Sequence, residues 1–411
     1  PAFLDQLAPE RLQKRLTGLD TAARQMPAGH IAVLDQKYPV LAVEHDRTHA
    51  KGHAPGEPPV KMENLPEEGF GPPPDILDVH RARFRAAIVL SNAPLKEQRK
   101  DARRDSISVR NGHAAMSSFL LGHLSDPHLG PMPQPRLREL AGKRAIGYLN
   151  WRRKRHLVHR RDILEDIVAD IHAQRPDHIA VTGDLVNIAL PMEFTEARKW
   201  LESVGTPDDV SLVPGNHDAY VRGFRDHFPH AWAEYLRGDE DAPTIDFPYL
   251  RRRGPLALIG LSTAIPTAPF MATGRLGHRQ REALAKLLQQ TAEENLFRVL
   301  MIHHPPKTSP GRWAARLHDS DELLDVIARH GAELVLHGHD HRYATVWLDG
   351  PRGRIPAIGV PSASAAALGH NHPAAYNLFS VMREGDAWRC DHRVRGFSGN
   401  KLGEIKNERL I

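Results

Sequence analysis

Two kinds of hydrophobic pattern alternate along the chain from Ser117 onward. Short continuous apolar runs are typical of buried strands, and segments with apolar residues at helical spacing are typical of amphipathic helices. The runs predict strands at Phe119–Leu124, His178–Thr182, Val210–Val213, Leu256–Leu261, Arg298–Ile302 and Glu333–Leu336. Helices are expected at Arg161–Gln174, Pro191–Ser203, His278–Gln290 and Ser320–His330. The alternation of strands and helices predicts an α/β domain with parallel strand pairs.

The pattern also suggests how the chain is divided. Further runs at Thr345–Leu348, Ile355–Gly359, Tyr376–Met382 and Trp388–Val394 predict strands of a second sheet. Residues 1–115 carry little periodic apolar pattern and contain proline clusters, so we expect a poorly structured or dispensable N-terminal leader there, with a small accessory domain as the alternative. Met116 stands directly before the first strand. We therefore predict one catalytic domain over residues 116–395 and a C-terminal tail over 396–411.

The composition limits which cellular compartment and which kinds of site are expected. Cys390 is the single cysteine, which excludes an internal disulfide and a cysteine metal site, and we expect a buried thiol. No apolar run reaches the roughly 18 to 20 residues that a membrane span needs. We predict a cytoplasmic protein and leave open a peripheral contact with the inner face of a membrane. The number of histidines is more informative about the site, since the chain has 26 and several lie in short clusters.

Five polar blocks each follow one of the apolar runs. The blocks are Asp126-Pro127-His128, Gly183-Asp184, Gly215-Asn216-His217-Asp218, His303-His304 and Gly338-His339-Asp340-His341. In open α/β sheets, ligands bind beyond the carboxyl ends of the strands, where we expect all five blocks to meet. Carboxylates, imidazoles and an amide oxygen without a thiolate suit divalent Mn, Fe, Zn or Co. Each block alone is a weak signal, but five in order at strand ends strongly predict a metal site.

These blocks resemble the motifs of the calcineurin-like metallophosphoesterase superfamily over roughly residues 117–385. The resemblance implies two mixed β-sheets in a sandwich flanked by helices, with two divalent metal ions at the strand ends. It implies that the first ion is bound by Asp126, His128 and His341, that the second is bound by Asn216, His303 and His339, and that Asp184 bridges both.

The resemblance also implies catalytic roles. His217 matches the histidine that handles a proton, with Asp218 expected to orient it, and a metal-bound hydroxide would be the nucleophile. Asn187 and His304 are weaker candidates for contacts with the substrate or for supporting positions behind the metal ligands.

A basic segment, Lys143–Arg161, is unusual. It contains eight lysines and arginines and no acidic residue, with apolar side chains such as Ile146 and Trp151 between them. It is interpretable as a solvated helix, a peripheral membrane contact, an anionic substrate clamp or a nucleic-acid patch.

The sequence therefore predicts a metallophosphoesterase that hydrolyses a phosphodiester or pyrophosphate bond. The substrate would be a small nucleotide, such as a cyclic nucleotide, or a nucleotide-lipid. The formal charge of only +5 does not favour nucleic acid as a partner. A DNA repair-type nuclease and a non-catalytic, metal-free binding scaffold of the same fold are the alternatives. The sequence does not indicate the oligomeric state.

Overall fold

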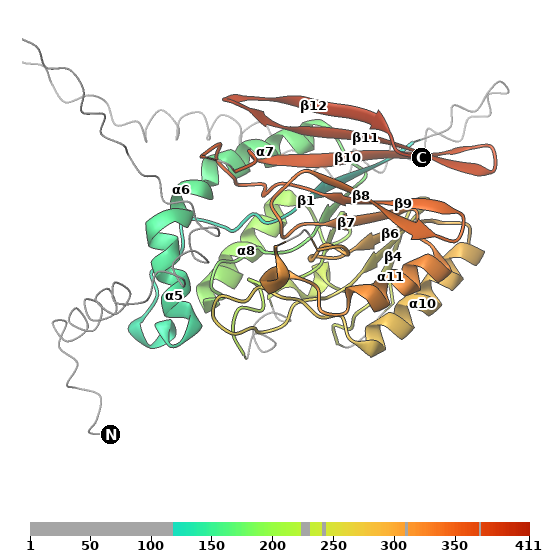
Figure 1. The fold of residues 1–411 in the computed structure, drawn as a ribbon. Coiled ribbons are helices and arrows are strands. Elements are labelled where there is room, and N and C mark those ends of the chain that lie inside the picture. The colour runs from blue at the N-terminus through green and yellow to red at the C-terminus, as the bar shows by residue number, and fades with distance from the viewer. Residues whose placement is uncertain (1–117, 223–230, 241–243, 309–310, 370) are drawn as a thin grey trace, which may run out of the picture. The chain divides into compact units, whose positions relative to one another are not determined.

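Two six-stranded β-sheets form the centre of the described part of the chain (Figure 1). The computed structural model describes residues 118–222, 231–240, 244–308, 311–369 and 371–411, so the predicted leader at 1–115 lies outside the described residues. The first sheet has the order β12-β11-β10-β1-β2-β3 and the second β4-β5-β6-β7-β9-β8. The strands are β1 (Phe119–Leu124), β2 (His178–Val181), β3 (Val210–Leu212), β4 (Tyr249–Arg253), β5 (Leu256–Gly260), β6 (Phe297–Met301), β7 (Leu334–His337), β8 (Ala344–Gly350), β9 (Gly353–Gly359), β10 (Ala375–Glu384), β11 (Ala387–Ser398) and β12 (Lys401–Arg409).

The strands that precede the polar blocks run parallel within each sheet. β1 pairs with β2 and β2 with β3 in parallel, and β5, β6, β7 and β9 form a second parallel series. Parallel strands are buried on both faces, which explains why their sequences are continuous apolar runs. Their carboxyl ends therefore share one edge of each sheet, as the sequence predicted.

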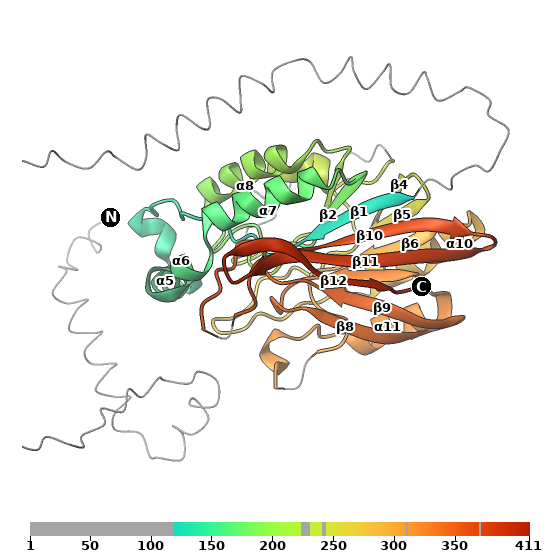
Figure 2. The same ribbon diagram turned by 90° about the horizontal axis from the view of Figure 1, so that it is seen from above.

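Helices cover the outer face of each sheet (Figure 2). The helices and short helical turns are η1 (Leu137–Leu140), α5 (Lys143–Asn150), η2 (Trp151–Arg155), α6 (His156–Val158), α7 (Arg161–Ala173), α8 (Pro191–Val204), η3 (Ala233–Tyr235), α10 (His278–Glu293), η4 (Trp313–Ala315) and α11 (Ser320–His330). α7 and α8 share a core with β1, β2 and β3, whereas α10 and α11 pack on β5, β6 and β7. A third core lies between the sheets, so the architecture is a sandwich of two mixed sheets flanked by helices.

The alternation of side chains on β6 shows how the layers form. Leu300 and Ile302 belong to the core under α10 and α11, whereas Val299 and Met301 belong to the core between the sheets. Successive residues of a strand point to opposite faces, so one apolar run supplies both layers.

Two predictions about the C-terminal third were wrong. The four late strands do not make a separate second sheet, because β8 and β9 extend the sheet of β7 whereas β10 and β11 extend the sheet of β1. The expected tail over 396–411 contains β12, which pairs antiparallel with β11. β12 is largely exposed and polar, so its sequence lacks the apolar run that marks the buried strands.

A helical arm, defined here as residues 143–158, follows β1 and comprises α5, the π-helical turn η2 and α6 (Figure 1). Trp151 anchors it, being only 7% exposed. A Cβ at Gly130 would lie 3.1 Å from the Trp151 ring, and one at Gly147 would lie 2.5 Å from the Tyr220 hydroxyl. Glycines at these two positions allow the arm to pack closely on the loops after β1 and β3.

We predict that the buried ion pair between Arg298 and Glu333 stabilises the start of β6 and β7. Glu333 accepts two hydrogen bonds from the guanidinium, at 2.8 Å and 2.7 Å, and the Arg298 side chain is only 2% exposed. Glu333→Ala leaves this charge without its carboxylate, which costs about 3–5 kcal/mol for a buried pair. Urea unfolding measures the loss. Glu202→Ala, which removes an exposed pair with Arg198, is the control and should cost roughly 0.3–0.5 kcal/mol. Equal losses for the two variants would contradict the prediction.

Candidate metal centre

The predicted metal-binding side chains all follow the carboxyl ends of parallel strands. Asp126 and His128 follow β1, Asp184 follows β2, Asn216 follows β3, His303 follows β6, and His339 and His341 follow β7. All are buried except His341, whose side chain is 32% exposed. The structure therefore brings together donors that the sequence separates by more than two hundred residues.

The backbone at this edge is strained. Five of the seven positions have left-handed backbone conformations, namely Asp126 (φ 53°), His128 (φ 38°), Asp184 (φ 57°), His339 (φ 68°) and His341 (φ 52°). Non-glycine residues in this region cost of order 1–3 kcal/mol each and concentrate at functional sites. The surrounding fold must supply that free energy, which indicates that the side-chain directions are specified.

Glycines let the loops approach one another closely. A Cβ at Gly215 would lie 2.1 Å from Oδ1 of Asp184, and a Cβ at Gly338 would lie 2.3 Å from Oδ2 of Asp126. Neither glycine has a positive φ, so close approach and not a left-handed turn requires glycine there.

The first group of donors surrounds His128. Its Nε2 lies 3.2 Å from Nε2 of His341, 3.7 Å from Oδ2 of Asp184 and 3.9 Å from Oδ1 of Asp126. His341 Nε2 also lies 3.0 Å from Asp126 Oδ1. Four donor atoms thus converge on one small volume.

The second group of donors includes the same Asp184 oxygen. His303 Nε2 lies 3.4 Å from Asp184 Oδ2 and 3.2 Å from Asn216 Oδ1. Donor atoms of Asp184, His303 and His339 all lie within 4.8 Å of one another. Asp184 is therefore the residue that the two groups share.

Backbone carbonyls hold three of these histidines in a defined orientation. His128 Nδ1 lies 3.2 Å from the carbonyl of Val186, and His303 Nδ1 lies 2.7 Å from that of Thr182. His339 contacts the carbonyl of Ala315 through Nε2 at 2.9 Å. When one ring nitrogen donates its N–H to a carbonyl, the other nitrogen keeps a free electron pair that can bind a metal. Histidines that bind metals usually have such a hydrogen bond.

Protonation states also fit a divalent metal. Burial lowers the pKa of His128 and of His339 well below the usual range, so both rings are neutral near pH 7. Burial would likewise lower the pKa of His303, but the Asp184 carboxylate raises it to about 10. Ligand rings must be deprotonated when a metal binds, so a metal at this position would displace the proton from His303.

His217 lies beside both groups. Its backbone N–H donates to Asp184 Oδ1 at 2.7 Å, and its ring meets the His128 ring edge-on at 4.8 Å between centroids. Nδ1 donates to the carbonyl of Asn187, so Nε2 carries the free electron pair. Burial, with the nearby Arg155, lowers the pKa of His217 to about 4.

The predicted role of Asp218 needs correction. Its carboxylate does not contact His217; it accepts hydrogen bonds from the backbone N–H groups of Asp184, Leu185, Val186 and Gly215 at 2.8–3.1 Å. Asp218 thus fixes the loop that carries Asp184, and the carbonyl of Asn187 orients His217.

The two weaker candidates, His304 and Asn187, are both buried. His304 is fully buried, and its ring nitrogens contact the Thr263 hydroxyl at 2.7 Å and the carbonyl of Ala272 at 3.0 Å. It packs behind His339, with 4.3 Å between the ring centroids. Asn187 is 2% exposed, and its side-chain N–H donates to the carbonyl of Leu129. Its Oδ1 has no hydrogen-bond partner among the described residues. A contact of either residue with the substrate stays a prediction.

Sequence reasoning missed two residues of the helical-arm region. His159 is buried beside His128, with 4.5 Å between the ring centroids, and Arg155 reaches His217. Both lie in the basic segment Lys143–Arg161, where composition gave no sign of which side chains point inward. The spacing of four residues between them was the available signal, since it places both on one helical face.

The remaining surface of that segment is mixed. Arg152 and Arg153 are exposed, as are the apolar Ile146, Leu149 and Leu157. No helix among the described residues is long and apolar enough to cross a membrane. The peripheral membrane contact stays a prediction.

A sandwich of two mixed sheets with a histidine–carboxylate cluster at the strand ends is typical of metal-dependent phosphoesterases. The family model for calcineurin-like phosphoesterases matches residues 119–343, more than half of the chain, and the protein belongs to this family. It is therefore a hydrolase of phosphoesters, and its fold implies divalent metal ions.

Individual relatives are more distant. A probable cyclic nucleotide phosphodiesterase from Synechococcus sp. is 27% identical over 226 residues, which cover 54% of this chain and 78% of that protein. A probable cyclic nucleotide phosphodiesterase from Rhodococcus erythropolis is 27% identical over 248 residues, which cover 59% and 72%. Among solved structures, a dimetal phosphatase from Danio rerio is aligned with 71% of this chain and 98% of its own, at 13% identity and a TM-score of 0.47.

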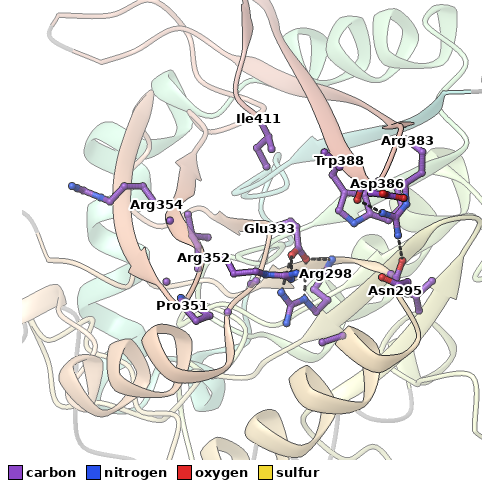
Figure 3. Close-up of a pocket in the computed structure, with 18 residues that line it drawn as sticks. Asn295, Arg298, Glu333, Pro351, Arg352, Arg354, Arg383, Asp386, Trp388 and Ile411 are labelled. Carbon is purple, nitrogen blue, oxygen red and sulfur yellow. Dashed lines mark hydrogen bonds and ion pairs between the residues drawn. The ribbon is translucent and has the colours of Figure 1, made fainter.

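A cavity of about 280 Å³ lies away from the metal-binding edge (Figure 3). Its walls include Arg298 at the start of β6, Glu333 just before β7 and Arg354 near the start of β9, so it lies at the amino ends of the parallel strands. Its most buried charges, Arg298 and Glu333, pair with each other. This cavity is separate from the candidate metal centre.

We predict that Gly338→Ala reduces metal binding. The new methyl group would lie 2.0 Å from the Ser125 hydroxyl and would displace the Asp126 carboxylate. We expect roughly 10- to 100-fold weaker affinity for Mn, as for losses of supporting contacts at metal sites. Elemental analysis after equilibrium dialysis measures the bound metal. Gly403→Ala is the matched control, because nothing lies within 4 Å of its added Cβ. Full metal content in Gly338→Ala would show that the loop adapts.

Proposed function

We propose that this phosphoesterase hydrolyses a small nucleotide phosphodiester, such as a cyclic nucleotide, with two divalent metal ions. The observation that carries the proposal is the convergence of two donor groups on Oδ2 of Asp184, from His128 at 3.7 Å and from His303 at 3.4 Å. The two relatives named as probable cyclic nucleotide phosphodiesterases support the substrate class. A pyrophosphate bond in a nucleotide-lipid is the second substrate class that such a centre would accept.

The donor groups divide between two ions in a simple way. We assign Asp126, His128 and His341 to one ion, assign Asn216, His303 and His339 to the other, and give Asp184 to both. Two bound divalent ions neutralise phosphate charge and make water acidic enough to supply a nucleophile near neutral pH. Mn, Fe, Zn and Co all accept this donor set.

The chain supplies a candidate for proton transfer. His217 faces the shared Asp184, and its Nδ1–H is held by the carbonyl of Asn187, so Nε2 is the atom that exchanges a proton. In the substrate-free structure the ring is neutral near pH 7, because its pKa is lowered to about 4. An anionic phosphate beside the ring favours the protonated form. We propose that His217 then gives this proton to the leaving alkoxide.

The alternatives have less support. A metal-free binding scaffold does not require the strained backbone that aims Asp126, His128 and Asp184 at one point. The formal charge of only +5 gives a nuclease no support.

We expect a chelator to abolish hydrolysis of an aryl phosphodiester and of cyclic AMP, and Mn to restore it. Asp184→Ala should be the most damaging single change, because it removes a donor from both ions. Its loss of turnover should exceed the roughly 10- to 100-fold typical of residues that only support a ligand.

Asp349→Ala, an exposed aspartate on β8, is the matched control and should leave turnover and metal content unchanged. Near-wild-type turnover of Asp184→Ala would refute the shared-ligand assignment.

His217→Ala should retain metal and lose turnover by roughly 10²–10⁴-fold, the range for a proton-transfer role. The loss should be smaller for aryl diesters with good leaving groups, which need little protonation. Steady-state kinetics on substrates of graded leaving-group pKa measures this dependence. His278→Ala, an exposed histidine on α10, is the control. Equal losses for good and poor leaving groups would argue against proton donation.

A further inference from the structure

The basic side chains of the helical arm point in different directions. Arg152 and Arg153 are exposed to solvent, whereas the Arg155 side chain points inward, toward the proposed metal centre. Arg155 is the last residue of the π-helical turn η2, and such turns are frequent at functional sites. The turn thus places one of the arm's charges in the centre.

Two histidines contact the Arg155 guanidinium. One terminal nitrogen lies 3.1 Å from His217 Nε2, and the other lies 3.5 Å from His159 Nε2. A histidine ring carries no negative charge, so neither of these contacts neutralises the guanidinium. Within the described ranges, no carboxylate lies at ion-pair distance from Arg155.

The arm holds this guanidinium in a fixed place. His159 Nδ1 contacts the Ser364 hydroxyl at 2.9 Å, and the backbone N–H of Arg160 donates to the Ser364 carbonyl at 2.9 Å. The N–H of Ala366 donates to the carbonyl of Val158 at 2.8 Å. The end of the arm is therefore fastened to the loop after β9.

A largely buried cation needs a counter-ion. The carboxylates that act on Arg155 at longer range are chiefly Asp184 and Asp126, which the proposed function assigns to the metals. If those charges are used by metals, the positive charge of Arg155 beside His217 has no matching negative charge. An anion bound at Arg155 would complete the pairing.

We propose that Arg155 binds a non-bridging oxygen of the substrate phosphate. The inference rests on the proposed function, since it places the substrate between the donor groups and His217. The planar guanidinium can donate two hydrogen bonds to one phosphate group. On binding, the phosphate takes over the hydrogen bond that Arg155 now gives to His217 Nε2, which frees that nitrogen to face the leaving oxygen. Arg155 thereby links recognition of the phosphate to the position of His217.

The test is calorimetric binding of inorganic phosphate to the Mn-loaded protein, with metal content measured on the same samples. Arg155→Gln should bind phosphate roughly 10- to 100-fold more weakly, as expected for loss of a charge-assisted hydrogen bond. Its metal content should match the wild type, because Arg155 is not a metal donor. Arg155→Lys should recover part of the affinity, since it restores the charge without the planar pair of donors.

Arg153→Gln is the matched control on the exposed side of the same turn, and its phosphate affinity should equal that of the wild type. For cyclic AMP, Arg155→Gln should raise KM as well as lower kcat, because substrate binding itself is weakened. Unchanged phosphate affinity in Arg155→Gln would overturn the proposal, as would loss of metal from that variant. If Arg155→Gln does not fold, Arg155→Met is measured instead, since it also removes the charge, and wild-type phosphate affinity in that variant overturns the proposal.

The outcomes separate this inference from the proposed function. If phosphate binding depends on Arg155 but the protein hydrolyses no phosphodiester, the phosphate-binding role of Arg155 stands and the proposed function is wrong. If the wild-type protein hydrolyses the diester and Arg155→Gln binds phosphate with wild-type affinity, the proposed function stands and the role of Arg155 is wrong.

Discussion

The burial of one shared carboxylate, Asp184, is the constraint on which the rest of the centre depends. A buried carboxylate is stable only where hydrogen bonds or positive charge compensate it. Here one oxygen accepts a hydrogen bond from the backbone N–H of His217, and the other lies 3.4 Å from Nε2 of His303 and 3.7 Å from Nε2 of His128. Two divalent ions would supply the same compensation more strongly. The shared position of Asp184 is therefore what makes a two-ion centre the best account of the cluster.

The fold serves that carboxylate by fixing the backbone around it. Asp218 binds four N–H groups of the neighbouring loops, and carbonyls of Thr182 and Val186 hold the rings of His303 and His128. The left-handed backbone at several donor positions opposes folding, and the three apolar cores of the sandwich offset that cost. The same hydrogen bonds thus hold the loops and position the donor side chains. Loss of any of them would move the donor atoms relative to Asp184.

Local signals in the sequence predicted the strands that carry the candidate site but not the pairing of the sheets. The apolar runs before Asp126, Asp184 and His303 predicted the strands to within a residue or two, because buried parallel strands are marked by their own composition. The partner of β10 is β1, far away in the chain, and no local pattern encodes such a choice. The direction of Arg155 depends on the π-helical turn, and the contacts of Asp218 are with backbone groups. The residue types alone therefore predict neither the direction of the Arg155 side chain nor the contacts of Asp218.

The central claim is that Asp184 is a ligand of two metal ions at once. Anomalous diffraction from crystals of the Mn-loaded protein tests it most directly, because it locates each ion independently of activity. The account predicts two anomalous peaks, one among Asp126, His128 and His341 and the other among Asn216, His303 and His339, with the Asp184 carboxylate in contact with both. A single peak, or a pair of peaks of which only one contacts Asp184, would contradict it.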